Sequence, residues 1–102
     1  MSKLDYEKTF YDSGELWQER WYLDGKLHND EGPAIICYRR DGSVRWKEWF
    51  LDGKRHNEEG PTIICYREDG CVEWEKWFLD GVEYSEEEWR DLMFRKAFEG
   101  AL

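Results

Sequence analysis

Two consecutive segments of this chain have nearly the same sequence. Residues 24–51 and 52–79 are two copies of one unit, and they are identical at most positions. Their shared pattern is DGK-x-HN-x-EGP-x-IICYR-x-DG-x-V-x-W-x-x-WFL. A fixed period of this length is typical of proteins in which each unit stacks on the next. We therefore expect one domain over residues 1–102, with partial copies at 1–23 and 80–84.

Glycines punctuate this pattern at alternately longer and shorter intervals, and most of them follow an aspartate. Asp-Gly between β-rich segments is a strong hairpin signal, because glycine accepts the positive φ that the turn requires. The spacing predicts structural turns at Gly25, Gly42, Gly53, Gly70 and Gly81.

The segments between the turns are rich in aromatic and β-branched residues, which favours strands. We expect long strands at 5–11, 15–23, 34–40, 43–51, 62–68 and 71–79. Short extended pieces are expected at 26–28, 54–56 and 82–84. The predicted fold is mainly β, an antiparallel β-meander of stacked 28-residue hairpin repeats with a C-terminal capping α-helix.

That helix is predicted over residues 85–100, where the repeated pattern stops. Ser85 followed by Glu88 is a capping box, and the acidic residues after Ser85 complement the positive start of a helix. An open array of strands needs its last edge covered, so we expect the helix to cap the sheet. A dimerisation or partner-binding helix is the alternative.

The net charge of −9 grows more acidic toward the C-terminus, where residues 80–102 carry seven acidic and three basic groups. Such a surface repels phosphate backbones and anionic lipid headgroups. We therefore expect no direct nucleic-acid binding and no membrane binding. A protein partner with a basic surface is the partner that this charge favours.

The cysteines indicate a reduced compartment. Cys37 and Cys65 occupy the same place in the two copies, each within an apolar IICY strand where a buried thiol belongs. A Cys65–Cys71 disulfide across one hairpin is the alternative. The N-terminus is polar and no apolar run approaches the roughly 20 residues of a membrane helix, so we expect a cytoplasmic protein.

The unit W-[YF]-L-D-G-K-x-H-N-x-E-G-P-x-I-I-x-Y resembles the variant MORN-type repeats found among bacteria, phages and large DNA viruses. The resemblance covers Trp21 to about Tyr84 and implies a β-hairpin array used for binding or scaffolding. The aromatic and turn positions of that family match three tryptophans and three glycines: Trp21, Trp49, Trp77, Gly25, Gly53 and Gly81. The net charge disfavours the phospholipid binding sometimes attached to ordinary MORN repeats.

Few residues in this sequence are candidates for catalysis or metal binding. His28 and His56 lie beside carboxylates, which invites a metal or acid–base reading, but the third copy has Tyr84 there and the spacing lacks a zinc pattern. We interpret both histidines as structural turn residues bonded to the backbone. No CxxC pair, phosphate-binding glycine loop or distinctive carboxylate pair is present. We expect no enzymatic activity, no cofactor and no metal.

Trp46 and Trp74 hold equivalent places and are each flanked by charges. They either pack as cores of adjacent hairpins or anchor a binding face, because tryptophan carries much interface energy. The candidate partner-binding residues are Trp46, Trp74, Glu73, Glu75, Glu86 and Glu87.

We expect a non-enzymatic interaction protein, an inhibitor of the phage anti-defence or toxin-immunity type that occludes a basic site. The alternatives are a self-assembling scaffold, with a homodimer possible, and a sugar-type ligand binder on an aromatic groove.

Overall fold

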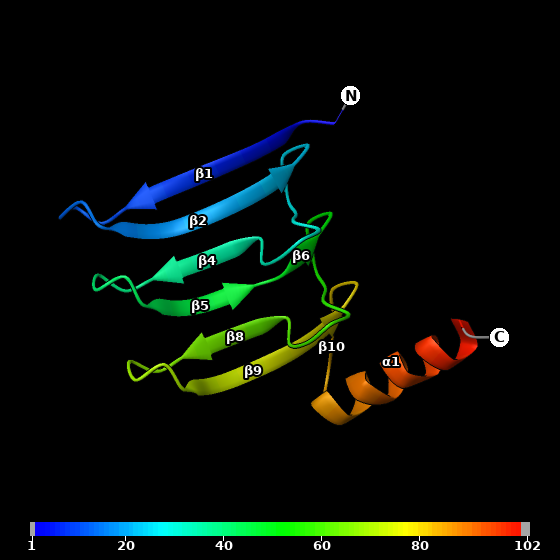
Figure 1. The fold of residues 1–102 in the computed structure, drawn as a ribbon. Coiled ribbons are helices and arrows are strands. Elements are labelled where there is room, and N and C mark those ends of the chain that lie inside the picture. The colour runs from blue at the N-terminus through cyan, green and yellow to red at the C-terminus, as the bar shows by residue number, and fades with distance from the viewer. Residues whose placement is uncertain (1, 101–102) are drawn as a thin grey trace.

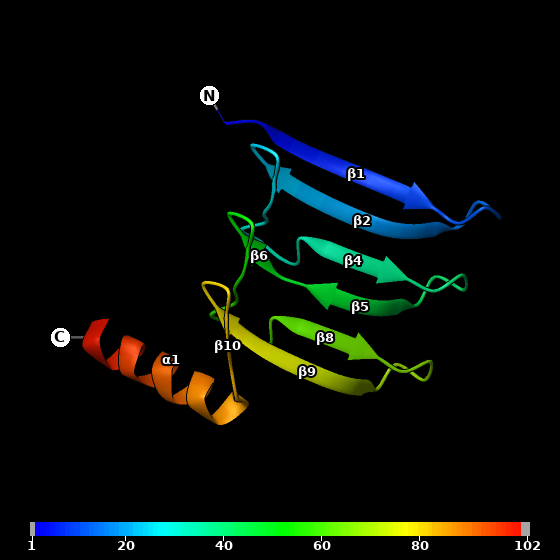
Figure 2. The same cartoon turned by 180° about the vertical axis from the view of Figure 1, so that it is seen from behind.

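A computed structural model describes residues 2–100 as a mainly β chain with one C-terminal helix. The strands lie side by side in one layer, and the helix lies beyond one end of the strands (Figures 1 and 2). All paired strands are antiparallel, in the order β1-β2-β4-β5-β8-β9-β10. The elements are β1 Leu4–Phe10, β2 Leu16–Leu23, β3 Lys26–Leu27, β4 Ile35–Tyr38, β5 Val44–Glu48, β6 Phe50–Leu51, β7 Lys54–Arg55, β8 Ile63–Tyr66, β9 Val72–Leu79, β10 Val82–Tyr84 and α1 Glu86–Gly100.

Type I′ hairpin turns close one end of the sheet. Asp24, Asp52 and Asp80 have φ of 51°, 54° and 49°, and the glycine after each has a φ of 80–82°. Two successive positive φ values match the right-handed twist of the flanking strands. The Asp-Gly signal thus specifies the turn from local chemistry alone.

The turns at the other end are wider. The Ser43 carbonyl accepts a hydrogen bond from Arg39 N at 2.8 Å, and Gly42 has a φ of 91°. The carboxylate of Asp41 accepts a bond from Ser43 N at 2.8 Å, which rigidifies the loop. The same backbone bonds recur in the loop around Gly70.

The predicted strand over 43–51 is interrupted at Trp49, which separates β5 from β6. Trp49 N donates to the Thr62 carbonyl at 2.9 Å, and then β6 leaves the main sheet to pair with β7. The equivalent β9 continues without a break from Val72 to Leu79. The long strand of the first copy is therefore two strands.

From β2 to β9, isoleucines separate the charged residues on each row across the sheet, whereas β1 places Lys8 directly opposite Glu19. Lys47 pairs with Ile36 and Ile64, which pair in turn with Glu19 and Glu75. Charges of alternating sign are therefore two strands, or about 10 Å, apart. This arrangement favours one strand register without close ion pairs.

The sheet is thin for a chain of this length. Its extents are 53 × 41 × 20 Å, and its radius of gyration is 15.4 Å, against about 13 Å for a compact domain of 100 residues. One buried cluster consists of Ala34, Ile35, Cys37 and Phe50, with Leu27 and Trp46 packed against it. Much of both faces remains accessible to a partner.

The capping box predicted before α1 is formed. Glu88 N donates to Ser85 Oγ at 3.1 Å, and Ser85 N donates to Glu88 Oε1 at 2.9 Å. The bond from the Ser85 backbone N–H holds the pKa of the Glu88 carboxyl below its usual value. In the part of the chain that the structure describes, no helix is long and apolar enough to cross a membrane.

Candidate functional site

Trp46 and Trp74 lie on one face of the sheet, each paired with Cys65 from β8 between them. They line a shallow depression of about 320 Å³. Trp74 is 45% exposed, and Lys76 Nζ lies 5.9 Å from the centroid of its ring. Arg55 and Glu48 also line the depression and form an ion pair at 3.3 Å, so its charged residues are of both signs.

The candidate carboxylates do not gather around these two tryptophans. Glu73 reaches toward them, with Oε2 4.0 Å from Cys65 Sγ. Glu75 points to the opposite face, because side chains alternate along β9. Glu86 and Glu87 lie in the first turn of α1. The structure therefore brings together only half of the candidate residues.

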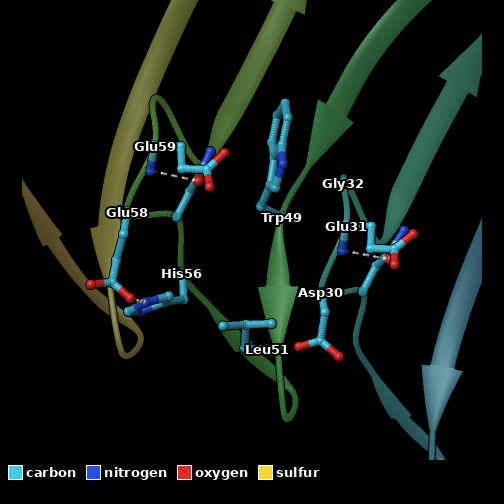
Figure 3. Close-up of a pocket in the computed structure, with 10 residues that line it drawn as sticks. Asp30, Glu31, Gly32, Trp49, Leu51, His56, Glu58 and Glu59 are labelled. Carbon is cyan, nitrogen blue, oxygen red and sulfur yellow. Dashed lines mark hydrogen bonds and ion pairs between the residues drawn. The ribbon is translucent and has the colours of Figure 1, made fainter.

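The opposite face carries a second row of tryptophans, Trp21, Trp49 and Trp77, which hold equivalent places in successive copies. A groove of about 290 Å³ lies between loops 29–32 and 56–59, over Trp49 and Leu51 (Figure 3). We call it the Trp49 groove. Its lining includes four carboxylates and neither lysine nor arginine: Asp30, Glu31, Glu58 and Glu59.

An asparagine shapes each loop of this groove. Asn29 Nδ2 donates to the Pro33 carbonyl at 2.9 Å, while Asn29 Oδ1 accepts a bond from Glu31 N at 3.1 Å. Asn57 makes the same two bonds in the second copy, at 2.8 and 3.0 Å. Because the asparagine satisfies the loop backbone, the neighbouring carboxylates are not needed for that purpose and can bond to other groups.

The histidines join each copy to the next turn. His28 Nδ1 accepts a hydrogen bond from Asp52 N at 2.8 Å, and its Nε2 lies 3.1 Å from Asp30. His56 bonds in the same way to Asp80 N, at 2.9 Å, and lies 3.2 Å from Glu58. An accepting Nδ1 carries no proton, so Nε2–H donates to the carboxylate. Both ring nitrogens are therefore occupied, and among residues 2–100 no three potential ligands cluster to hold a metal ion.

Aromatic partners cover two of the three tryptophans in this row. Tyr6 stacks on Trp21 with ring centroids 5.0 Å apart, and Trp89 stacks on Trp77 at 4.6 Å. Within the described residues no ring stacks on Trp49. Trp77 is only 6% exposed, whereas Trp49 is half-buried.

Two phenols flank one carboxylate near Trp21. Tyr6 and Tyr38 each donate their hydroxyl to Glu19. The hydrogen bond to Glu19 raises the pKa of Tyr6 to about 12. Burial, together with the same carboxylate, raises the pKa of Tyr38 as well. Both phenols keep their protons at neutral pH, so we assign them a structural role.

The cysteines offer no activated thiolate. Cys37 is buried and accepts a hydrogen bond from Gln18 Nε2 at 2.9 Å. Burial raises the pKa of its thiol, which disfavours the reactive form. Cys65 and Cys71 are both free, so the alternative of a bridge between them is wrong.

Sequence reasoning did not single out the residues of the Trp49 groove as a site. The sequence marks Trp49 only as a repeat position, and Asp30 and Glu58 only as neighbours of the histidines. The available signal is the EG-containing loop beside each histidine, which recurs with its carboxylates in both copies. No protein-family model, curated protein or solved structure matches this chain. Comparison of its own two copies therefore carries the functional argument.

Proposed function

We propose that this chain is a non-enzymatic protein-interaction module that binds a basic surface of a protein partner. The observation that supports it best is the Trp49 groove, in which a half-buried tryptophan lies among four carboxylates and no lysine or arginine. Aromatic anchors with complementary charge are the usual source of affinity and specificity at interfaces. The net charge of −9 steers a cationic partner toward the molecule.

The architecture that we propose for this role is an array of 28-residue hairpin repeats of the variant MORN type, capped by α1. In such an array the carboxylate-bearing loops recur at a regular interval. A row of that kind can replace phosphates on a nucleic-acid-binding site. The activity would then be inhibition by occlusion, as in phage anti-defence or toxin-immunity proteins acting in the cytoplasm.

The test is capture of partners from host lysate with the tagged full chain at low salt. We expect a basic protein that elutes as salt is raised, because screening weakens the attraction between surface charges. The captured protein should also lose its nucleic-acid binding when the chain is added. Failure to capture any basic protein above background, or a partner whose nucleic-acid binding is unaffected, would contradict the proposal.

Self-assembly is the second candidate function. Strand β1 is an edge strand whose residues are almost all exposed, including Leu4 at 79% and Phe10 at 55%. An exposed edge with apolar side chains is a template for pairing with another chain. Light scattering at high protein concentration distinguishes the two functions, because a monomer would exclude assembly.

A further inference from the structure

Helix α1 partly covers the groove next to the Trp49 groove. One copy further along the chain, Trp77 and Leu79 take the places of Trp49 and Leu51 in the groove floor. Leu92, Met93 and Lys96 of α1 line this space together with Leu79 and Glu58. The structure therefore contains one groove that a helix occupies in part, with a space of about 320 Å³ left between them.

Three contacts define how the occupant binds. The ring of Trp89 packs on Trp77 with the two ring planes tilted by 49°, and its indole N–H donates to the Asn57 carbonyl at 3.0 Å. Two helical turns later, Lys96 forms an ion pair with Glu58. Trp89 is 5% exposed, so the stacked pair is the buried centre of the contact. On the helix, an aromatic residue and a cation lie two helical turns apart. They contact a tryptophan, a backbone carbonyl and a carboxylate of the repeated part of the chain.

The Trp49 groove presents the same three groups without an occupant. Trp49 has no stacked ring, and among residues 2–100 the Asn29 carbonyl oxygen accepts no hydrogen bond. The Asp30 side chain, equivalent to Glu58, is 77% exposed and lies 3.1 Å from His28 Nε2. Figure 3 shows Trp49 standing between the two loops and Asp30 at the mouth of the space between them.

We propose that the Trp49 groove binds a helix of the partner protein that carries an aromatic side chain and, two helical turns later, a lysine or arginine. This inference rests on the proposed function and specifies its site and the chemistry of the partner. The aromatic side chain stacks on Trp49, and an indole or phenol donates to the Asn29 carbonyl. The cation pairs with Asp30.

Charge indicates a foreign helix and not α1 of a second copy. Within α1 five acidic residues outnumber three basic ones, and each whole chain carries −9. Two such molecules repel each other at low ionic strength, whereas a basic helix is attracted by Asp30, Glu31 and Glu59, the groove carboxylates that α1 does not pair.

A peptide probe tests this inference on the full-length protein. The probe has the sequence of residues 85–100 with Glu87→Lys and Asp91→Lys, which makes it basic while Trp89 and Lys96 are kept. Isotope-labelled protein is titrated with it while the Trp49 indole and the amides of residues 29–32 are followed by NMR. We expect saturable shifts at these signals with a Kd between about 10 μM and 1 mM, because a short helix must be ordered on binding.

Matched variants establish the site. Asp30→Lys should weaken the Kd by about tenfold, because it replaces an attraction with a repulsion, whereas Asp12→Lys, at the opposite end of the sheet, should leave it within about twofold. Probes with Trp89→Ala or Lys96→Glu should each bind about tenfold more weakly. Should Asp30→Lys disturb the fold by circular dichroism, Asp30→Asn provides the same test with a smaller effect.

Several outcomes would overturn the inference. These are no saturation up to millimolar peptide, shifts confined to other surfaces, equal weakening by Asp30→Lys and Asp12→Lys, or a self-association that Asp30→Lys abolishes. The proposed function fails separately, if the probe binds the groove but lysate yields no basic partner. Conversely, if a captured partner binds the Asp30→Lys variant as tightly as the wild type, the proposed function stands and the proposed site is wrong.

Discussion

At the scale of single residues, His28 and His56 join neighbouring copies through one ring nitrogen each. Their Nδ1 atoms accept bonds from the backbone of the following Asp-Gly turn, at 2.8 and 2.9 Å. Each ring is largely shielded, with side-chain exposures of 12% and 13%. Each histidine therefore bonds to the backbone of the next copy, although its position in the sequence belongs to the preceding copy.

We expect His56→Ala to lower the free energy of unfolding by about 1 kcal/mol, because Asp80 N loses its acceptor at a partly wet site. Urea denaturation followed by tryptophan fluorescence measures the change. Lys54→Ala, an exposed substitution nearby, should change stability by less than about 0.5 kcal/mol. Equal stability of the two variants would show that the histidine bond contributes nothing.

The tyrosine pair at Glu19 predicts an alkaline effect. The folded-state pKa of Tyr6 is raised to about 12, so its stabilising contribution is present below the ordinary value of about 10. That contribution is lost as pH rises from there through the folded value. Absorbance of tyrosinate should show late titration of Tyr6 and Tyr38 in the wild type.

The matched variant is Glu19→Gln, which removes the charge that resists ionisation of both phenols. We expect its tyrosinate titration to begin at lower pH than that of the wild type. Superimposable titration curves would mean that the two hydrogen bonds to Glu19 are not maintained in solution.

At the scale of elements, α1 is attached to the sheet mainly by one aromatic pair. Trp77 and Trp89 are both nearly buried, while Phe94 and Phe98 on the same helix are 72% and 60% exposed. The apolar residues of α1 are therefore covered only on the side that faces Trp77. The remaining apolar side of α1 has no partner among the described residues.

We expect Trp89→Ala to lower the free energy of unfolding by about 3 kcal/mol and to release α1, because truncating a buried tryptophan leaves an unfilled space. Phe94→Ala should cost less than about 0.5 kcal/mol, because that ring is already in solvent. Thermal unfolding and the helical circular dichroism signal measure both variants. Equal losses in the two would contradict the attachment described here.

At the scale of the whole molecule, stability should vary along the row of strands. The strands make most of their contacts with their neighbours in one layer, and no second layer ties distant strands of the described chain together (Figure 1). Such quasi-one-dimensional folds open from their ends. The central strands β4, β5 and β8 should therefore be the most protected.

Amide hydrogen exchange tests this expectation. We expect protection to be highest in β4, β5 and β8 and to fall toward β1, by about 1–3 kcal/mol of opening free energy. The other edge, at β9 and β10, should regain protection where α1 covers Trp77. Uniform protection across all strands would indicate a single cooperative unit instead.

Local chemistry accounts for how well the elements can be predicted. Asp-Gly pairs with positive φ specify the type I′ turns, and Ser85 with Glu88 specifies the start of α1. Both features can therefore be predicted from a few adjacent residues. The break at Trp49 is not predictable in this way, because β9 has the same WFL segment and β2 makes the equivalent bond from Trp21 N to the Ala34 carbonyl, yet both strands are continuous.

Trp49 and Trp77 mark the limit of what the sequence determines alone. Both lie in the same local sequence, WFLDG, which specifies an extended segment followed by a turn at each place. Only the tertiary structure decided that Trp77 is covered by Trp89 while Trp49 is left half-buried beside Asp30. The physical reason is that a turn is set by its own backbone, whereas burial is set by whatever distant segment packs on top.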